Sequence, residues 1–184
     1  MKVVFLDRDG VINKYPGDFE YVKSWDEFSF LPGTSGALKQ INKKGYKIFI
    51  ISNQAGVGRG IYSQEALDLI TKNMLAELSR DGVEISGVYY CVHRKEENCP
   101  CRKPNTGLID IARSKMKDQG FDVDLKSSFF VGDTMRDIEA GKKSGLKTIL
   151  VFSGKEKPGN SSSWSEKPDF TAMDLSEAVD KYIK

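Results

Sequence analysis

Short apolar runs alternate with amphipathic segments along this chain. Five of these runs are rich in β-branched and aromatic residues, and they are Val3 to Leu6, Tyr46 to Ile51, Ile85 to Cys91, Ser128 to Val131 and Thr148 to Phe152. Such composition predicts β-strands. Because the runs contain few polar positions, they are typical of strands that are buried on both faces of a sheet.

The segments between the strands have apolar residues at helical spacing. The predicted helices follow Pro32-Gly33 up to Gly45, run from the N-cap Ser63 to Gly82, cover Gly107 to Gln119, run from Thr134 to Ser144, and span Leu175 to Tyr182. In the third of these we expect Ile111, Ala112 and Met116 on the inner face. Asp174 and Glu177 are spaced as a capping box for the last helix.

Strand–helix alternation of this kind predicts a parallel sheet with helices on both faces. We therefore expect an α/β fold, a Rossmann-like three-layer sandwich with a five-stranded, mainly parallel sheet, formed by one domain over residues 1–184. Residues 153–168 are rich in Gly, Ser, Lys and Pro and predict a mobile surface loop. Within that loop, Trp164 either packs the loop down or contacts a ligand.

Composition and charge narrow the function without identifying it. The chain has 184 residues, 39% of them hydrophobic, and a formal net charge of +2, which gives no basic field for nucleic acid. No apolar run reaches the roughly 18 residues of a membrane span. The first residues predict a strand and no signal peptide. We therefore expect a cytoplasmic protein without nucleic-acid or membrane partners. Nothing resembles a coiled coil, so a monomer is the default.

The segment Asp7-Arg8-Asp9-Gly10 places two carboxylates at the end of the first predicted strand. We expect no basic partner within the segment, so the negative charge calls for a cation where the buried strand meets solvent. A divalent cation with hard oxygen ligands meets that need. The alternative is an ordinary strand-to-turn junction, where Asp and Gly are common.

Polar side chains follow other strands in the same way. They are Ser52-Asn53-Gln54 after the second strand, Arg102-Lys103-Pro104 before a helix, and Gly132-Asp133-Thr134 with Asp137 after the fourth strand. Taken singly, each has an ordinary explanation as a turn, a solvated lysine or a helix-start acid. Together they lie at the carboxyl ends of strands in one sheet, where ligands of parallel α/β folds bind.

All three cysteines and the single histidine lie within eleven residues, as Cys91-x-His93 followed by Cys99-x-Cys101. Three thiolates and an imidazole suit tetrahedral Zn²⁺. Four protein ligands leave no open coordination position, which indicates a structural site. The loop 91–101 is then a small zinc-binding insert that directs Arg102 and Lys103 towards the ligand site.

Asp7-Arg8-Asp9-Gly10, Ser52-Asn53, Lys103-Pro104 and Gly132-Asp133 with Asp137 resemble the four ordered motifs of the haloacid dehalogenase (HAD) superfamily of phosphotransferases. The cysteine–histidine run is similar to its zinc-bearing branch, which contains the heptose bisphosphate and histidinol-phosphate phosphatases. The resemblance covers nearly the whole chain. Thr134 departs from it, since some members have a second Asp there, and this departure gives Asp137 more weight.

The resemblance implies a Mg²⁺-dependent phosphatase of a small phosphorylated sugar, HAD-like and nearly capless. Asp7 matches the nucleophile and Asp9 the general acid and base, while Ser52 and Lys103 match the groups that hold the phosphoryl oxygens. Asp7, the carbonyl of Asp9 and Asp133 match the Mg²⁺ ligands, and we expect Asp137 to orient them from behind.

Recognition of the rest of the substrate falls to side chains on the neighbouring loops. The candidates are Tyr21, Asn53, Gln54, Arg59 and Arg102. A heptose 1,7-bisphosphate that loses its C7 phosphate is the leading substrate. Histidinol phosphate and a polynucleotide 3′-phosphate are the enzymatic alternatives, and a zinc-ribbon binding module is the non-enzymatic one.

Overall fold

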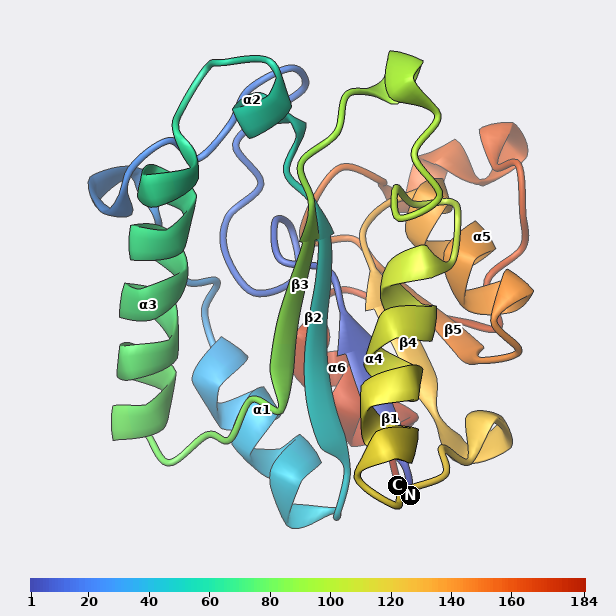
Figure 1. The fold of residues 1–184 in the computed structure, drawn as a ribbon. Helices are drawn as coiled ribbons and strands as arrows, with labels where there is room; N and C mark the ends of the chain where they lie inside the picture. The colour runs from blue at the N-terminus through green and yellow to red at the C-terminus, as the bar shows by residue number, and fades with distance from the viewer.

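The computed structural model describes residues 1–184 as one α/β sandwich (Figure 1). Its sheet has six strands in the order β3-β2-β1-β4-β5-β6, and every neighbouring pair is parallel. The strands are β1 (Val3–Leu6), β2 (Lys47–Asn53), β3 (Gly87–Cys91), β4 (Phe129–Gly132), β5 (Lys147–Val151) and β6 (Phe170–Ala172). The expected fold class is confirmed, with one strand more than the five expected.

The unexpected strand, β6, has three residues and forms one edge of the sheet beside β5. Asp169, the residue before β6, ties the start of this strand to β5. The Oδ2 of Asp169 accepts hydrogen bonds from the backbone N and the Oγ1 of Thr148 at 2.8 and 2.9 Å. A run of three residues carries too little alternation to predict a strand. The pairing with β5 is what makes it one.

Helices cover both faces of the sheet. They are α1 (Thr34–Lys43), α2 (Ala55–Gly58), α3 (Gln64–Arg80), α4 (Gly107–Asp118), α5 (Met135–Lys143) and α6 (Leu175–Lys181), with short 3₁₀ turns η1 (Trp25–Glu27), η2 (Lys95–Glu97), η3 (Leu125–Ser127) and η4 (Pro158–Ser163). Buried residues of α1, α3 and α6 share one core cluster, and those of α4 and α5 share the other. None of the helices combines the length and the apolar composition that a membrane span requires.

The side chains of β1 alternate between the two cores. Val4 and Leu6 belong to the cluster under α1 and α3, whereas Val3 and Phe5 belong to the cluster under α4. All four are fully buried. Side chains of a strand alternate between the two faces, so a central strand in a covered sheet has to be apolar at every position.

The helix caps follow the sequence with one difference in detail. Ser63 Oγ accepts from Ala66 N at 3.2 Å, as an N-cap does. Asp174 caps α6 by accepting from Glu177 N at 2.9 Å. The Glu177 carboxylate accepts from Met173 N, one residue before the N-cap, so the capping box is shifted.

The predicted inner face of α4 is partly wrong. Ala112 and Met116 are buried, but Ile111 is 44% exposed, and Leu108 and Ile109 take its place against the sheet. Residues 108, 109, 112 and 116 form a continuous helical stripe, and position 111 lies beside that stripe.

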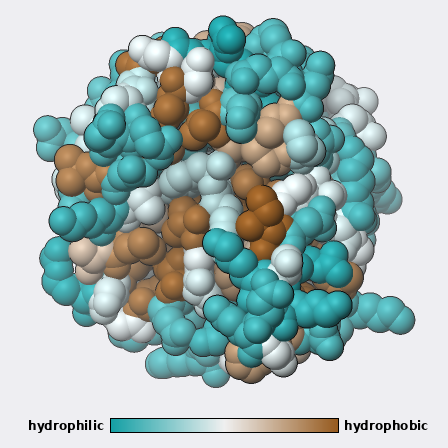
Figure 2. Space-filling view, in the orientation of Figure 1, coloured by the Kyte–Doolittle hydropathy of each residue, from teal (hydrophilic) through white to brown (hydrophobic).

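Residues 153–168 pack on the fold through several contacts. The Trp164 ring stacks on Phe152 with a centroid distance of 6.3 Å, and its Nε1 donates to Glu156 at 3.1 Å. Of the two roles considered for Trp164, these contacts favour packing. In the face that Figure 2 shows, hydrophobic residues gather towards the middle, where β3 forms the edge of the sheet between α3 and α4, and hydrophilic residues surround them.

Candidate active site

A pocket of about 340 Å³ opens at the carboxyl ends of the strands. Asp7 and Asp9 follow β1, Ser52 and Asn53 end β2, and Asp133 follows β4, so the sheet topology brings them to one edge. Lys103 enters from the segment before α4. The structure therefore brings together the four separated motifs that the sequence singled out.

Lys103 lies at the centre of the buried charges, with its side chain 2% exposed. Its Nζ is 2.9 Å from Asp7 Oδ2 and 2.6 Å from Asp137 Oδ1, and it donates to Ile51 O at 2.8 Å. Asn53 fixes the backbone of Lys103 from both sides, donating to its carbonyl and accepting from its N, each at 3.1 Å. The Asn53 amide is thus occupied in placing the lysine.

Three buried carboxylates, those of Asp7, Asp133 and Asp137, lie within 4.8 Å of one another. Burial raises the pKa of Asp7 to about 6, although the Lys103 charge opposes this. Burial, reinforced by the two neighbouring carboxylates, raises the pKa of Asp133 well above its usual range. One lysine does not neutralise three acids, and the excess of hard oxygen ligands fits Mg²⁺.

Two glycines allow the backbone to approach the Asp133 carboxylate closely. A Cβ on Gly10 would lie 2.3 Å from Asp133 Oδ2, and a Cβ on Gly154 would lie 2.0 Å from it. Gly10 also has a φ of +81°, which L side chains rarely adopt. The N of Lys155 donates to Asp133 Oδ2 at 2.7 Å, so the loop after β5 holds this acid in place.

Asp137 has a structural as well as an electrostatic role. Its Oδ2 accepts from the N of Thr134 at 3.0 Å and from Thr134 Oγ1 at 2.6 Å, which caps α5. Its other oxygen faces Lys103. Asp137 thus lies behind Lys103 at the start of α5, and its expected role in orienting the metal ligands stays a prediction.

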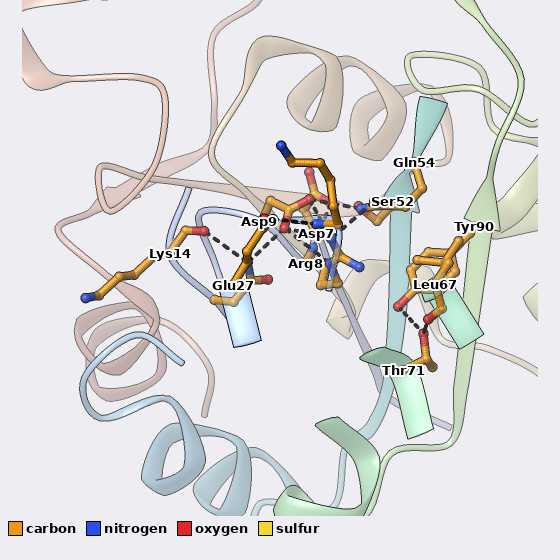
Figure 3. Close-up of polar contacts among 12 residues, drawn as sticks. Asp7, Arg8, Asp9, Lys14, Glu27, Ser52, Gln54, Leu67, Thr71 and Tyr90 are labelled. Carbon is orange, nitrogen blue, oxygen red and sulfur yellow. Dashed lines mark hydrogen bonds and ion pairs between the residues drawn. The ribbon is translucent and has the colours of Figure 1, made fainter. Parts of the chain in front are cut away.

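The expectation that Asp7 and Asp9 have no basic partner within their segment is wrong. Arg8 is fully buried, and its Nη2 lies 3.0 Å from Asp9 Oδ1 (Figure 3). The acid-x-acid pattern directs attention to the carboxylates, and an arginine between them on a strand end would ordinarily face solvent. The Arg8 side chain is buried under the pocket because of the way in which the turn at residues 8–13 folds.

Gln54 also differs from its expected role as a substrate contact. Its side chain is buried, does not line the pocket, and donates to Asp9 Oδ2 at 2.9 Å and to Ser52 Oγ at 3.2 Å. It follows β2 directly, one residue after Ser52 and Asn53 end that strand, but it points beneath the site (Figure 3). The sequence places Gln54 at the right strand end, and the direction of its side chain is a tertiary result.

The four soft ligands converge beside the pocket. Nδ1 of His93 is 3.7 Å from Cys91 Sγ and 3.6 Å from Cys101 Sγ, and the sulfurs of Cys99 and Cys101 are 3.0 Å apart. A tetrahedral zinc with Zn–S of about 2.3 Å and Zn–N of about 2.0 Å separates its ligand atoms by about 3.5–3.8 Å. The residues therefore fit zinc. The Cys99 and Cys101 sulfurs lie closer together than the ligand atoms of a tetrahedral site do.

The zinc-type loop leads directly to the pocket wall. Arg102 donates from Nη1 to the carbonyl of His93 at 3.1 Å, so its guanidinium is fixed by the loop. Burial lowers the pKa of Arg102, and the nearby charges of Arg136 and Arg59 lower it further. Three guanidiniums around one pocket favour an anionic ligand.

The rim of the pocket comes from the loop 15–21 after β1, and no separate domain covers it. Of the other expected contacts, Tyr21 and Arg59 line the pocket. Residues that the sequence reasoning missed are Tyr15, Asp18, Lys95, Arg136 and Lys155. Arg136 could have been found, because it lies one residue before Asp137 in the first turn of a helix that starts at a strand end. The others lie on loops or, for Lys95, in the short turn η2, and no local pattern fixes the path of these segments.

The known proteins that are similar in sequence to this chain are HAD-like hydrolases and heptose bisphosphate phosphatases. A family model described as HAD-hydrolase-like matches residues 100–178. The D-glycero-alpha-D-manno-heptose-1,7-bisphosphate 7-phosphatase of Photorhabdus laumondii is 39% identical over 162 residues, 84% of each chain. The D-glycero-D-manno-heptose-1,7-bisphosphate 7-phosphatase of Chlorobaculum tepidum is 34% identical over 99% of this chain and 94% of its own.

Solved structures give the same result. The D,D-heptose 1,7-bisphosphate phosphatase from B. bronchiseptica, complexed with magnesium and phosphate, aligns with a TM-score of 0.84 at 29% identity, covering 98% of this chain and 97% of its own. The D,D-heptose 1,7-bisphosphate phosphatase from Burkholderia thailandensis aligns with a TM-score of 0.70 at 26% identity over 100% and 99% of the two chains.

Proposed function

Since this chain belongs to the family of D-glycero-D-manno-heptose-1,7-bisphosphate 7-phosphatases, which are HAD-like hydrolases, we propose that it hydrolyses the C7 phosphate of that sugar through an aspartyl-phosphate. The chain is thus a phosphoric monoester hydrolase. The observation that carries the mechanism is the contact of Asp7 with Lys103 in a pocket where three acids meet.

In the first half of the reaction, a carboxylate oxygen of Asp7 attacks phosphorus. The bond between phosphorus and the sugar oxygen breaks, and that oxygen takes a proton from Asp9. Ser52 and Lys103 hold the phosphoryl oxygens, where negative charge is redistributed. Lys103 Nζ already lies 2.9 Å from Asp7 Oδ2, so it can stay in contact with the phosphoryl oxygens while the group is transferred to Asp7.

In the second half, Asp9 returns to its starting state. A water molecule attacks phosphorus of the aspartyl-phosphate and gives its proton to the Asp9 carboxylate. The bond between phosphorus and the Asp7 oxygen breaks, inorganic phosphate leaves, and Asp7 is again a carboxylate. One residue thus acts first as acid and then as base.

The residues that would hold Mg²⁺ are Asp7, Asp133 and the backbone carbonyl of Asp9, and the bound ion would neutralise charge on the phosphoryl oxygens. The excess of buried acids over lysine supports this assignment. Asp137, fixed by Thr134 and facing Lys103, keeps the lysine between the acids.

Cys91, His93, Cys99 and Cys101 would hold Zn²⁺ as a structural ion that ties the loop 91–101 together. That loop fixes Arg102 through the His93 carbonyl. We assign Arg102, with Arg59, to the second phosphate of the substrate, since guanidiniums bind phosphate in a bidentate manner. Tyr21 lies in the same pocket as a further substrate contact, and Asn53, which also lines it, acts on the substrate through its placing of Lys103.

We also propose that the protein is a cytoplasmic monomer that acts on a small molecule. Three thiols placed for a metal suit a reducing compartment. The net charge of +2 gives no general attraction to nucleic acid.

The function is tested by phosphate release in Mg²⁺ from heptose 1,7-bisphosphate, histidinol phosphate and a 3′-phosphorylated oligonucleotide. We expect turnover of the heptose bisphosphate to exceed that of the other two. Asp7→Asn should abolish turnover, whereas Asp68→Asn, on the exposed face of α3, should retain it. Full activity of Asp7→Asn would exclude Asp7 as the nucleophile. If the wild-type protein binds zinc but releases no phosphate from any of the three substrates, it is a binding module.

A further inference from the structure

A chain of buried polar groups runs beneath the pocket and ends on Asp9 (Figure 3). Asp9 Oδ1 accepts from Arg8 Nη2 at 3.0 Å, from Arg8 Nε at 3.2 Å and from Asn13 Nδ2 at 2.8 Å. Asp9 Oδ2 accepts from Gln54 Nε2 at 2.9 Å and from Arg8 Nη2 at 3.2 Å. Both oxygens of a side chain that is 21% exposed are therefore held from behind.

The orientation of the Gln54 amide is fixed by the groups around it. Its Oε1 accepts from Tyr62 OH at 2.7 Å and from Arg8 Nη2 at 3.1 Å. Two donors on the oxygen oblige the Nε2 to face Asp9 and Ser52. Gln54 therefore joins two groups that act on the substrate without lining the pocket itself.

Arg8 keeps Asp9 on this side of the pocket. The guanidinium is fully buried, its Nη1 has no hydrogen-bond partner, and the only carboxylate in contact with it is that of Asp9. On its other side it lies over the Tyr90 ring, 5.8 Å from the centroid. Moving Asp9 away would leave a buried charge without a counter-ion, which is unfavourable.

We propose that Gln54, supported by Tyr62 and Arg8, is a positioning residue that holds the Asp9 carboxyl group where the leaving oxygen of the substrate departs. The proposal rests on the role of Asp9 as general acid in the proposed function. A merely structural network would anchor the turn at residues 8–13 and would affect every substrate alike. A positioning network affects a substrate in proportion to its need for a proton.

Leaving groups of different basicity separate the two roles. A sugar alkoxide needs a proton to leave, whereas the 4-nitrophenolate of 4-nitrophenyl phosphate leaves without one. Single-turnover rates, with the full-length protein in excess and Mg²⁺ present, are measured for heptose 1,7-bisphosphate and for 4-nitrophenyl phosphate. The variants are Gln54→Leu, which removes the amide, and Tyr62→Phe, which removes only one donor and keeps the ring.

We expect Gln54→Leu to lower the rate on the sugar phosphate about 10- to 100-fold, short of the full contribution of a general acid, and to change the aryl phosphate rate by less than about 3-fold. Tyr62→Phe should give a smaller loss in the same direction. Thr71→Val is the matched control, because it removes a half-buried hydroxyl that contacts Tyr90 OH, on the far side of Arg8, and should leave both rates unchanged.

Equal losses on both substrates for Gln54→Leu and Tyr62→Phe, or no loss on either, would overturn the proposal. Asp9→Asn distinguishes this failure from that of the mechanism behind it. Selective loss on the sugar phosphate in Asp9→Asn with none in Gln54→Leu refutes positioning alone. Equal rate losses on the two substrates in Asp9→Asn would refute the general-acid role as well. Phosphate release by the wild-type protein would still support the phosphatase activity.

Discussion

Replacing Lys103 with methionine removes the one cation among three buried acids and keeps the length of the side chain. In the structure, Lys103 Nζ is 2.6 Å from Asp137 and 2.9 Å from Asp7 and donates to the Ile51 carbonyl at 2.8 Å. At these distances each ion pair contributes about 6 kcal/mol at an effective dielectric constant of about 20. Desolvation of the lysine offsets much of that sum.

The net cost of removing one partner from a buried ion pair is about 3–5 kcal/mol, because the remaining charge stays buried. We therefore expect Lys103→Met to lose about 3–5 kcal/mol of unfolding free energy when metal is chelated. For a urea m-value of about 2 kcal/mol/M, the unfolding midpoint falls by about 2 M. The assay is urea unfolding with EDTA at neutral pH, and Lys72→Met on the exposed face of α3 is the control, expected within about 0.5 kcal/mol.

Added Mg²⁺ should restore part of this loss, since the variant site has one more uncompensated negative charge. We expect Lys103→Met to bind Mg²⁺ more tightly than the wild-type protein does, measured by calorimetry, while its kcat falls at least about 100-fold. A metal-free variant within about 1 kcal/mol of the wild-type protein would refute the view that Lys103 balances the three acids. Weaker Mg²⁺ binding by the variant would contradict the charge argument in a second way.

Three further predictions follow from other parts of the structure. Cys99→Ser should lower zinc content, measured by atomic absorption, and thermal stability together, since a closed zinc site contributes folding free energy; unchanged zinc content would exclude Cys99 as a ligand. Gly154→Ala should raise the Mg²⁺ concentration for half-maximal activity, because its Cβ would lie 2.0 Å from Asp133 Oδ2, whereas Gly159→Ala, in open space, should not. Burial favours a higher pKa for Asp169, but hydrogen bonds from Lys142 and Thr148 outweigh it and lower that pKa below 3.8. The stabilisation by Asp169 is therefore present above pH 3.8 and lost as pH falls through the folded-state pKa. Asp169→Ala should cost about 1–3 kcal/mol in urea unfolding equally at pH 7 and 5, with a smaller cost only at lower pH.

The sequence predicted the sheet core and the ends of the strands. The apolar run of β1 has no polar position, which only a strand covered on both faces requires. Because parallel strands end at the same edge, the sequence alone predicts that the acids after β1 and β4 meet, and Asp7 and Asp133 do. The cluster of three cysteines and one histidine could also be predicted, because these four residues lie close together in the chain.

Other features depended on contacts between distant segments. Strand β6 exists because Phe170–Ala172 pairs with β5, and its own three residues carry no pattern. Likewise, Ile111 and Leu108 are both apolar residues of one helix, and only the angle at which α4 lies on the sheet decides which of them is buried.

The sequence by itself determined which residues could perform the chemistry, because residue type and spacing follow from local rules of strands, helices and metal ligands. Tertiary structure alone decided what surrounds each of them. Arg8 pairs with Asp9, and Gln54 turns beneath the pocket, because the turn after β1 packs against the end of β2. Side-chain direction and burial depend on neighbours far apart in the chain, and these set the charge balance of the site.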